Sequence, residues 1–174
     1  MLNEKMEAAL NKQINAELYS SYVYLAMAAH FHGLNLEGFA NWMRIQAQEE
    51  NMHAMKIFDF IYERGGNVRL MALEAPPNEW DSPLDAFQQS YEHERKISGM
   101  IDELVNLALD IKDHATWNFL QWFVAEQVEE EDNANRVVEN LKLIGDNSAG
   151  LFMLDRELAQ RQPEAEAGED GGGE

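Results

Sequence analysis

Apolar side chains recur at seven-residue intervals along four long segments of the chain, and this spacing constrains the fold more than any other feature. Residues seven apart lie on nearly the same face of an α-helix, so each series predicts a helix with one face turned towards a core. The series are Leu10, Glu17, Tyr24 and Phe31; Met43, Glu50 and Ile57 beside Phe39, Gln46, His53 and Phe60; Phe87, Glu94, Ile101 and Ala108; and Leu120, Gln127, Ala134 and Leu141 beside Phe123, Glu130 and Val137. No convincing run alternates apolar and polar residues as a half-buried strand would, so the sequence predicts an all-α protein.

Turn and cap residues divide the chain into five expected helices. They cover about residues 3–32, 36–64, 83–112, 114–144 and 151–161. Three of the boundaries are marked by Gly33, Gly65 and Gly145. Ser82 before Pro83 is typical of a helix start, because serine caps the first turn and proline fits the first helical position. Asn35 is the expected cap of the second helix.

The lengths of the connections predict how these helices are arranged. Short turns join the first helix to the second and the third to the fourth, which favours antiparallel neighbours. The segment 66–81 is long enough to return along a bundle whose helices span about 45 Å. We therefore expect an antiparallel four-helix bundle with one long crossover and a short fifth helix, forming one domain over residues 1–162. The acidic, glycine-rich tail 163–174 is expected to be disordered.

Each apolar series is interrupted near its middle by a glutamate, glutamine or histidine. Burying one carboxylate costs on the order of several kcal/mol, so several at one level of a bundle need an explanation. Either the carboxylates are protonated, or cations bind among them. In a third reading the series are off register and the polar residues lie at the edge of the bundle. Because all four helices share the pattern, we favour a buried cation site.

The spacing of the polar residues repeats between the two halves of the chain. Glu17 precedes Glu50 by 33 residues. Glu94 precedes Gln127 by the same interval, and a shift of 77 superposes the halves. Residues three apart share a helix face, so Glu50 and His53 can hold one metal ion together. The repeat predicts a pseudo-two-fold bundle with two metal positions that share bridging carboxylates.

Composition narrows the classes of partner. The chain of 174 residues has 13 Lys and Arg against 32 Asp and Glu, a net charge of −19. Nucleic acids and anionic membranes are bound through Lys and Arg, so neither is an expected partner; the charge favours cations, or it serves solubility alone. Cysteine is absent, which excludes disulfides and thiolate metal sites. With no signal pattern and no long apolar run, a cytoplasmic protein is expected.

Several stretches resemble the non-haem ferritins of bacteria and archaea, and the likeness covers nearly all of residues 3–162. These stretches read QINAELYSSYVYLAMA, GFANWM, QEENMHAM, PPNEWDSPLDAF, YEHE and NFLQWFVAEQVEEE. Ferritin-like di-iron proteins carry a Glu on each of two helices and Glu-x-x-His on each of the other two; here Gln127-x-x-Glu130 replaces the last element. The resemblance implies a ferroxidase that oxidises Fe(II) to Fe(III) with O₂ or peroxide. It also implies storage of the ferric mineral in a hollow homo-oligomer of 24 subunits.

The resemblance further implies roles for individual residues, with two irons in each subunit. It assigns the first iron to Glu17, Glu50 and His53. It assigns the second iron to Glu50, Glu94 and Glu130, with Gln127 alongside. A third site in such ferritins would fall on Glu49, Glu126, Glu129 and Glu130.

The sequence leaves open the role of Tyr24 and two alternative functions, and it argues against a haem site. Tyr24 lies one heptad beyond Glu17, which makes it either a catalytic neighbour of the iron pair or a core aromatic. Haem is not expected, since Asn51 stands where bacterioferritins carry a haem-ligating methionine. Two other functions are compatible with the fold: a di-metal oxidase or peroxidase without storage, and a helical scaffold whose metal residues are degenerate.

Overall fold

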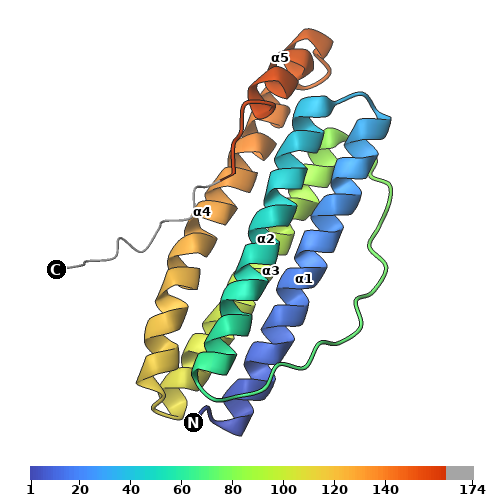
Figure 1. The fold of residues 1–174 in the computed structure, drawn as a ribbon. Coiled ribbons are helices and arrows are strands. Elements are labelled where there is room, and N and C mark those ends of the chain that lie inside the picture. The colour runs from blue at the N-terminus through green and yellow to red at the C-terminus, as the bar shows by residue number, and fades with distance from the viewer. Residues whose placement is uncertain (164–174) are drawn as a thin grey trace, which may run out of the picture.

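The computed structural model describes residues 1–163, which form five α-helices and contain no strand. The helices are α1 (Glu4–Gly33), α2 (Glu37–Glu63), α3 (Pro83–Asp110), α4 (His114–Ile144) and α5 (Ser148–Leu158). The segment between α2 and α3 runs back along the bundle (Figure 1). The predicted all-α bundle with one long crossover and a short fifth helix is confirmed. The predicted disordered tail, apart from Pro163, lies outside the described residues.

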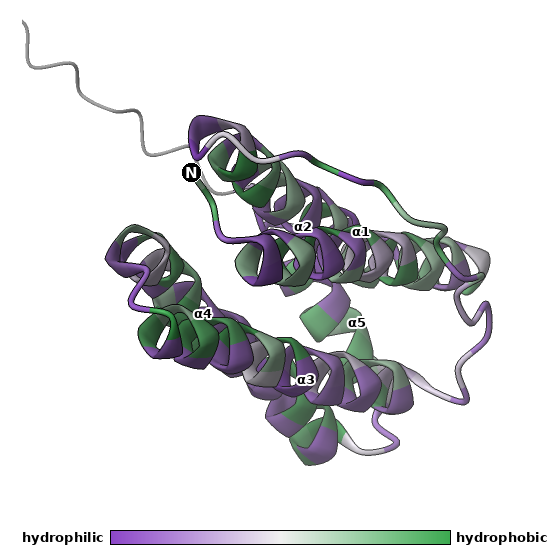
Figure 2. Cartoon of the chain, turned by 90° about the horizontal axis from the view of Figure 1, so that it is seen from below, coloured by the Kyte–Doolittle hydropathy of each residue, from purple (hydrophilic) through white to green (hydrophobic). Residues whose placement is uncertain are grey.

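Two helical hairpins build the bundle, α1 with α2 and α3 with α4. Seen from below, the two pairs lie on opposite sides, and each helix carries both hydrophobic and hydrophilic residues (Figure 2). The short α5 packs against α2 and α4. Among residues 1–163, none of the helices is both long and apolar enough to cross a membrane.

The core consists of two apolar clusters with a polar layer between them. One cluster includes Phe31 and Phe87, and the other includes Leu10, Ile57 and Phe123. The polar residues of the four series all lie buried at the middle of their helices: Glu17, Gln46, Glu50, His53, Glu94, Gln127 and Glu130. The reading that places these residues at the edge of the bundle is therefore wrong.

The predicted helix starts have mixed outcomes. Ser82 caps α3 as predicted, because its hydroxyl accepts the Asp85 N–H at 3.1 Å and Pro83 is the first helical residue. The prediction for Asn35 is wrong. Asn35 has a φ of 57°, a left-handed conformation that asparagine tolerates better than most residues, and Leu36 precedes α2 without a side-chain cap.

Asp155 of α5 caps α2 instead. Its Oδ1 accepts the N–H groups of Gly38 at 2.8 Å and Phe39 at 3.1 Å. The first turn of a helix leaves N–H groups unpaired, and a carboxylate there is favoured by the helix dipole. Docking of α5 therefore completes the first turn of α2.

The fifth helix begins earlier than its predicted range of 151–161. Asn147 caps it by accepting the N–H groups of Ala149 and Gly150 at 3.0 Å and 3.2 Å. It ends at Leu158, and a turn carries the chain on to Arg161. The early start was not predicted because Gly150 lies in the first turn of α5, and glycine weakens a helical pattern in the sequence.

Gly38 allows α5 to lie directly against α2. A Cβ at this position would stand 1.6 Å from the Asp155 carbonyl oxygen. We expect Gly38→Ala to displace α5 and to lower the thermal midpoint by roughly 2–12 °C, since overpacking costs about 1–3 kcal/mol and each kcal/mol shifts the midpoint by about 2–4 °C at this size.

Gly99→Ala is the matched control for that experiment. Gly99 lies within α3, and an added Cβ there meets no atom within 4 Å. The free energy of unfolding of this variant should rise by about 0.5–1 kcal/mol, the usual difference between alanine and glycine inside a helix. Differential scanning calorimetry measures both effects, and equal midpoints for the two variants would contradict the close packing of α5 on α2.

Candidate metal centre

Four helices bring polar side chains to one level of the core. α1 contributes Glu17, α2 contributes Glu50 and His53, α3 contributes Glu94, and α4 contributes Gln127 and Glu130. None of these side chains is more than 5% exposed. Because each occupies a core position of its helix, the packing of the bundle holds the group together.

Glu17, Glu50 and His53 form a compact group. One ligand atom from each lies within 4.8 Å of the others, and His53 Nδ1 is 3.5 Å from Glu50 Oε2. Glu17 Oε2, Glu50 Oε2 and His53 Nδ1 are buried and have no hydrogen-bond partner in the described part of the chain. Buried polar atoms are nearly always hydrogen-bonded, so these three atoms are suited to a bound cation. The group coincides with the residues assigned to the first iron.

A second group joins His53 to α4. Ligand atoms of His53, Glu126 and Glu130 lie within 4.8 Å of one another, and His53 Nε2 is 4.0 Å from Glu126 Oε1. The residues assigned to the second iron included Glu94 rather than Glu126, and Glu94 belongs to neither compact group among residues 1–163. His53 therefore belongs to both groups, with Nδ1 towards Glu50 and Nε2 towards Glu126.

Glu94 is engaged by hydrogen bonds from two neighbours. The Tyr24 hydroxyl donates to its Oε1, and Gln127 Nε2 donates to its Oε2 at 3.2 Å. Gln127 therefore lies alongside the Glu94 carboxylate. Tyr24 is fully buried, and it is at once a core aromatic and a direct neighbour of the cluster.

The residues assigned to a third iron are only partly gathered. Glu126 and Glu130 share the second group, whereas Glu129 is exposed. Glu49 is buried, and its Oε2 lies 2.5 Å from Arg161 Nη2. No pattern in the sequence assigns a role to Arg161, because it lies 112 residues from Glu49 and outside any helical period that relates the two.

Burial and mutual repulsion raise the pKa values of the clustered carboxyls. Loss of solvation raises the pKa of Glu17 and of Glu50 well above the ordinary value, and neighbouring carboxylates raise both further. Burial and then Glu94 raise the pKa of Glu130 to about 8. Within residues 1–163, no lysine or arginine forms a salt bridge with Glu17, Glu50, Glu94 or Glu130. Without a cation Glu130 therefore retains its proton at neutral pH, and a bound cation would favour its ionised form.

Two buried glutamines orient the carboxylates, and sequence reasoning assigned neither a role. Gln13 Nε2 donates to Glu17 Oε1 at 2.8 Å. Gln46 Nε2 donates to Glu50 Oε1 at 3.1 Å and to Glu130 Oε2 at 2.6 Å. The signal was present in the sequence, since each glutamine stands four residues before its glutamate, a spacing at which helical side chains meet.

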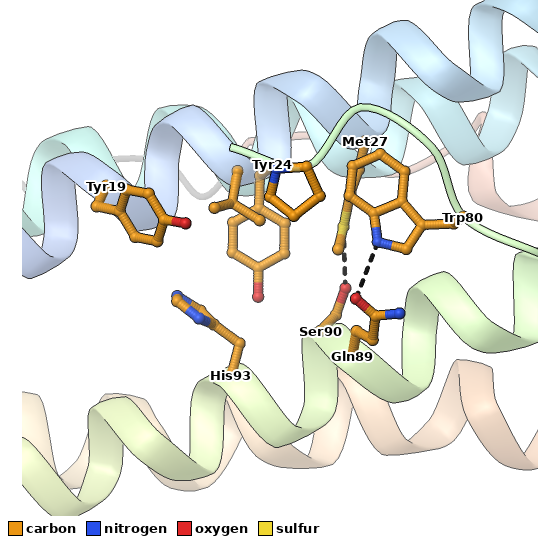
Figure 3. A pocket seen from close by; sticks show the side chains of 9 residues that line it. Tyr19, Tyr24, Met27, Trp80, Gln89, Ser90 and His93 are labelled. Atoms are coloured by element: carbon orange, nitrogen blue, oxygen red, sulfur yellow. Dashed lines mark hydrogen bonds between the residues drawn. The ribbon is translucent and has the colours of Figure 1, made fainter. Parts of the chain in front are cut away.

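A cavity of about 150 Å³ lies beside the cluster and beneath the crossover. Figure 3 shows Tyr24 of α1 and His93 of α3 lining it, with Trp80 of the crossover at one side. Burial and the nearby Lys96 lower the pKa of His93 to about 4, and its Nε2 lies 2.7 Å from the Ser20 hydroxyl. His93 is therefore a neutral structural residue. Tyr24 lines the cavity and donates to Glu94, so it lies between the cavity and the carboxylates.

Known proteins with similar sequences point to one family. Residues 7–144 match the family described as the ferritin-like domain. A bacterial non-heme ferritin of Bacteroides fragilis is 44% identical over 161 residues, which cover 92% of this chain and 100% of that protein. A bacterial non-heme ferritin of Escherichia coli O6:H1 is 40% identical over 159 residues, covering 91% of this chain and 96% of that protein.

Solved structures agree with the sequence matches. The open pore ferritin of the hyperthermophilic archaeon Archaeoglobus fulgidus superposes with a TM-score of 0.93 at 59% identity, covering 93% of this chain and 100% of that chain. The resemblance noted in the sequence is thereby confirmed over most of its length. On the fold, the buried carboxylate–histidine layer and these matches together, the chain belongs to the ferritin family.

Proposed function

We propose that this chain is the subunit of an iron-storage ferritin, which oxidises Fe(II) at its buried centre and stores the ferric product in a multi-subunit cage. One observation carries the proposal: Glu17 Oε2, Glu50 Oε2 and His53 Nδ1 are buried in one compact group without hydrogen-bond partners among the described residues. Family membership supports storage, since the relatives are named non-heme ferritins.

The donor set suits iron as a substrate. Carboxylate oxygens favour harder, more oxidised metal ions, and imidazole also binds iron, so this set lowers the reduction potential of bound iron. Two Fe(II) ions held close together each lose one electron. O₂ takes up these two electrons with two protons and becomes hydrogen peroxide, or peroxide takes up two electrons and two protons and becomes water.

Residues of the chain prepare each carboxylate for the metal. Gln13 donates a hydrogen bond to one oxygen of Glu17, and Gln46 donates one to an oxygen of Glu50. The second oxygen of each glutamate remains available to a metal. Protons held by the carboxyls with raised pKa values leave as Fe(II) enters. Tyr24 holds Glu94 by its hydroxyl, which fixes the orientation of the carboxylate from α3.

Our proposal places two irons in each subunit. The first is bound by Glu17, Glu50 and His53. The second is bound by Glu50, Glu94 and Glu130 near Gln127, with Glu126 as a further candidate because it lies in the group with His53. A third site at Glu49, Glu126, Glu129 and Glu130 stays a prediction, as do the 24-subunit cage and the cytoplasmic location.

Storage is tested by loading the metal-free protein with Fe(II) in air and separating the product by size-exclusion chromatography. We expect the protein to elute far above the size of one chain, together with ferric iron well beyond the two or three ions that the centre could hold. A di-metal oxidase without storage would oxidise Fe(II) but elute free of excess iron. Protein that neither oxidises nor retains iron would be the scaffold alternative, and would contradict the proposal.

A further inference from the structure

The segment that follows α5 brings Arg161 onto α2, beside the polar layer. Asn41 Nδ2 donates to the carbonyl oxygens of Leu158 at 3.3 Å and Arg161 at 3.2 Å. Asp155 bonds the first turn of α2 at the same time. The backbone at Arg161 is therefore held on α2 by contacts that do not use the Arg161 side chain.

The Arg161 guanidinium makes four directed contacts with α2. It stacks on Trp42 with 4.4 Å from Cζ to the ring centroid, and its Nη1 donates to the Trp42 carbonyl at 3.4 Å. Nη2 donates to Glu49 Oε2 at 2.5 Å, and Nη1 donates to Gln46 Oε1 at 3.0 Å. A planar fork of this kind fixes the groups it binds in a way that a lysine ammonium does not.

Gln46 transmits this contact to the buried carboxylates. Its Oε1 faces Arg161, while its Nε2 donates to Glu50 Oε1 and to Glu130 Oε2. An amide turned the other way would set its oxygen against two carboxylates and its N–H groups against a guanidinium. Arg161 and the carboxylates therefore fix one orientation of Gln46 from opposite ends, and bonds in such a chain strengthen one another.

From this chain of contacts we propose that Arg161 is a positioning residue for the metal centre. It locks the Gln46 amide so that Glu50 and Glu130 each have one oxygen bonded to Nε2, and this orientation leaves Glu50 Oε2 available to the metal. The inference rests on the proposed metal-binding function and extends it, because it makes the docked C-terminal segment part of the site. Groups that orient metal ligands in this way typically change affinity about 10–100-fold when they are removed.

The test is an anaerobic titration with Co(II), which stands in for Fe(II). Binding is monitored through the visible absorption of the bound Co(II). Arg161→Met keeps an unbranched apolar side chain over Trp42 but removes the charge and the donors. We expect Co(II) binding to weaken about 10-fold, with a changed absorption spectrum. Arg156→Met is the matched control, because Arg156 is exposed on α5 and its guanidinium lies over the exposed Phe152 ring, at 6.0 Å from Cζ to the ring centroid. This variant should bind Co(II) as the wild type does.

The direction of the change in Co(II) affinity distinguishes a positioning role of Arg161 from a purely electrostatic effect of its charge. Removing a positive charge near an acidic cluster would tighten the binding of Co(II) by electrostatics alone, whereas loss of positioning weakens it. Unchanged or tighter binding in Arg161→Met would therefore overturn the proposal. A role confined to holding α5 would lower the thermal midpoint and leave the Co(II) spectrum unchanged, which would also overturn it.

A double-mutant cycle tests whether Arg161 acts through Gln46. Gln46→Met should weaken Co(II) binding by itself, and Arg161→Met should add little in that background, since coupled residues are non-additive. Fully additive effects would show that Arg161 does not act through the amide. Wild-type protein that binds no Co(II) would instead contradict the proposed function, so the two failures are distinguishable.

Discussion

The double variant Glu50→Ala/His53→Ala is expected to lose rapid Fe(II) oxidation, by about 100-fold or more, while keeping its helical content. Glu50 belongs to the group with Glu17, and His53 belongs to both compact groups, so the two substitutions remove ligands from both proposed iron positions. Removal of groups that merely orient ligands already costs about 10–100-fold. Stopped-flow absorbance of ferric formation measures the rate, and far-UV circular dichroism measures the helices.

A second double variant on the same helix controls for the loss of acidic residues in general. Asp59→Ala/Glu63→Ala removes two exposed carboxylates of α2, one turn apart. Its oxidation rate should stay within about two-fold of the wild type, since exposed side chains away from the site contribute little. Oxidation at the wild-type rate in Glu50→Ala/His53→Ala would falsify the assignment of the site.

The metal-free protein is expected to lose stability as the pH rises from about 5 to about 8. The pKa of Glu130 is raised to about 8 in the folded chain, and those of Glu17, Glu50 and Glu94 are raised as well. An unfolded glutamate titrates near about 4.3, so in this window the folded state binds more protons than the unfolded state. The stabilisation is complete below the unfolded pKa and is lost as the pH rises through the folded value.

Thermal unfolding at several pH values measures this effect. A buried carboxylate costs on the order of several kcal/mol to ionise, so the midpoint should fall by roughly 10 °C across the window. Glu130→Gln should flatten the dependence, because its amide oxygen can still accept the bond from Gln46 without ionising. Glu103→Gln, at an exposed position of α3, should leave the dependence unchanged.

Metal binding should offset the cost of ionising the buried carboxylates. Zn(II), which has no redox chemistry, should raise the midpoint most at high pH, where the carboxylates need the least deprotonation to bind it. At a free Zn(II) concentration 100 times the dissociation constant, binding at one site raises the free energy of unfolding by about 2.7 kcal/mol. A metal-free protein whose stability rises from pH 5 to pH 8 would contradict the raised pKa values of the cluster.

Helical period was sufficient to predict which polar residues are buried. Glu17, Glu50, Glu94 and Gln127 each continue an apolar series at seven-residue spacing, and burial follows directly from the phase of that series. The crossover was also predictable, since only a long connection can return along the bundle. The i, i+4 pairs that Gln13 and Gln46 form with their glutamates obey the same helical geometry and could have been found.

Contacts between distant elements could not be predicted in this way. Asp155 caps α2 across 117 residues, and Arg161 reaches Glu49 across 112. A period describes one face of one helix and says nothing about which residue of another helix will meet it. The same limit explains Asn35: its position before α2 suggested a cap, but tertiary contact with α5 supplied the cap and left Asn35 to make the turn.

The proposed metal centre is tested most directly by locating Fe(II) in the protein before any oxidation occurs. Crystals loaded with Fe(II) under anaerobic conditions, and measured with X-rays on either side of the iron absorption edge, reveal iron by its anomalous signal. We predict two peaks in each subunit, one within bonding distance of Glu17, Glu50 and His53 and the other beside Glu50 and Glu130. Iron found only at exposed acidic residues, with the buried layer empty at saturating Fe(II), would contradict the claim that this layer is the ferroxidase centre.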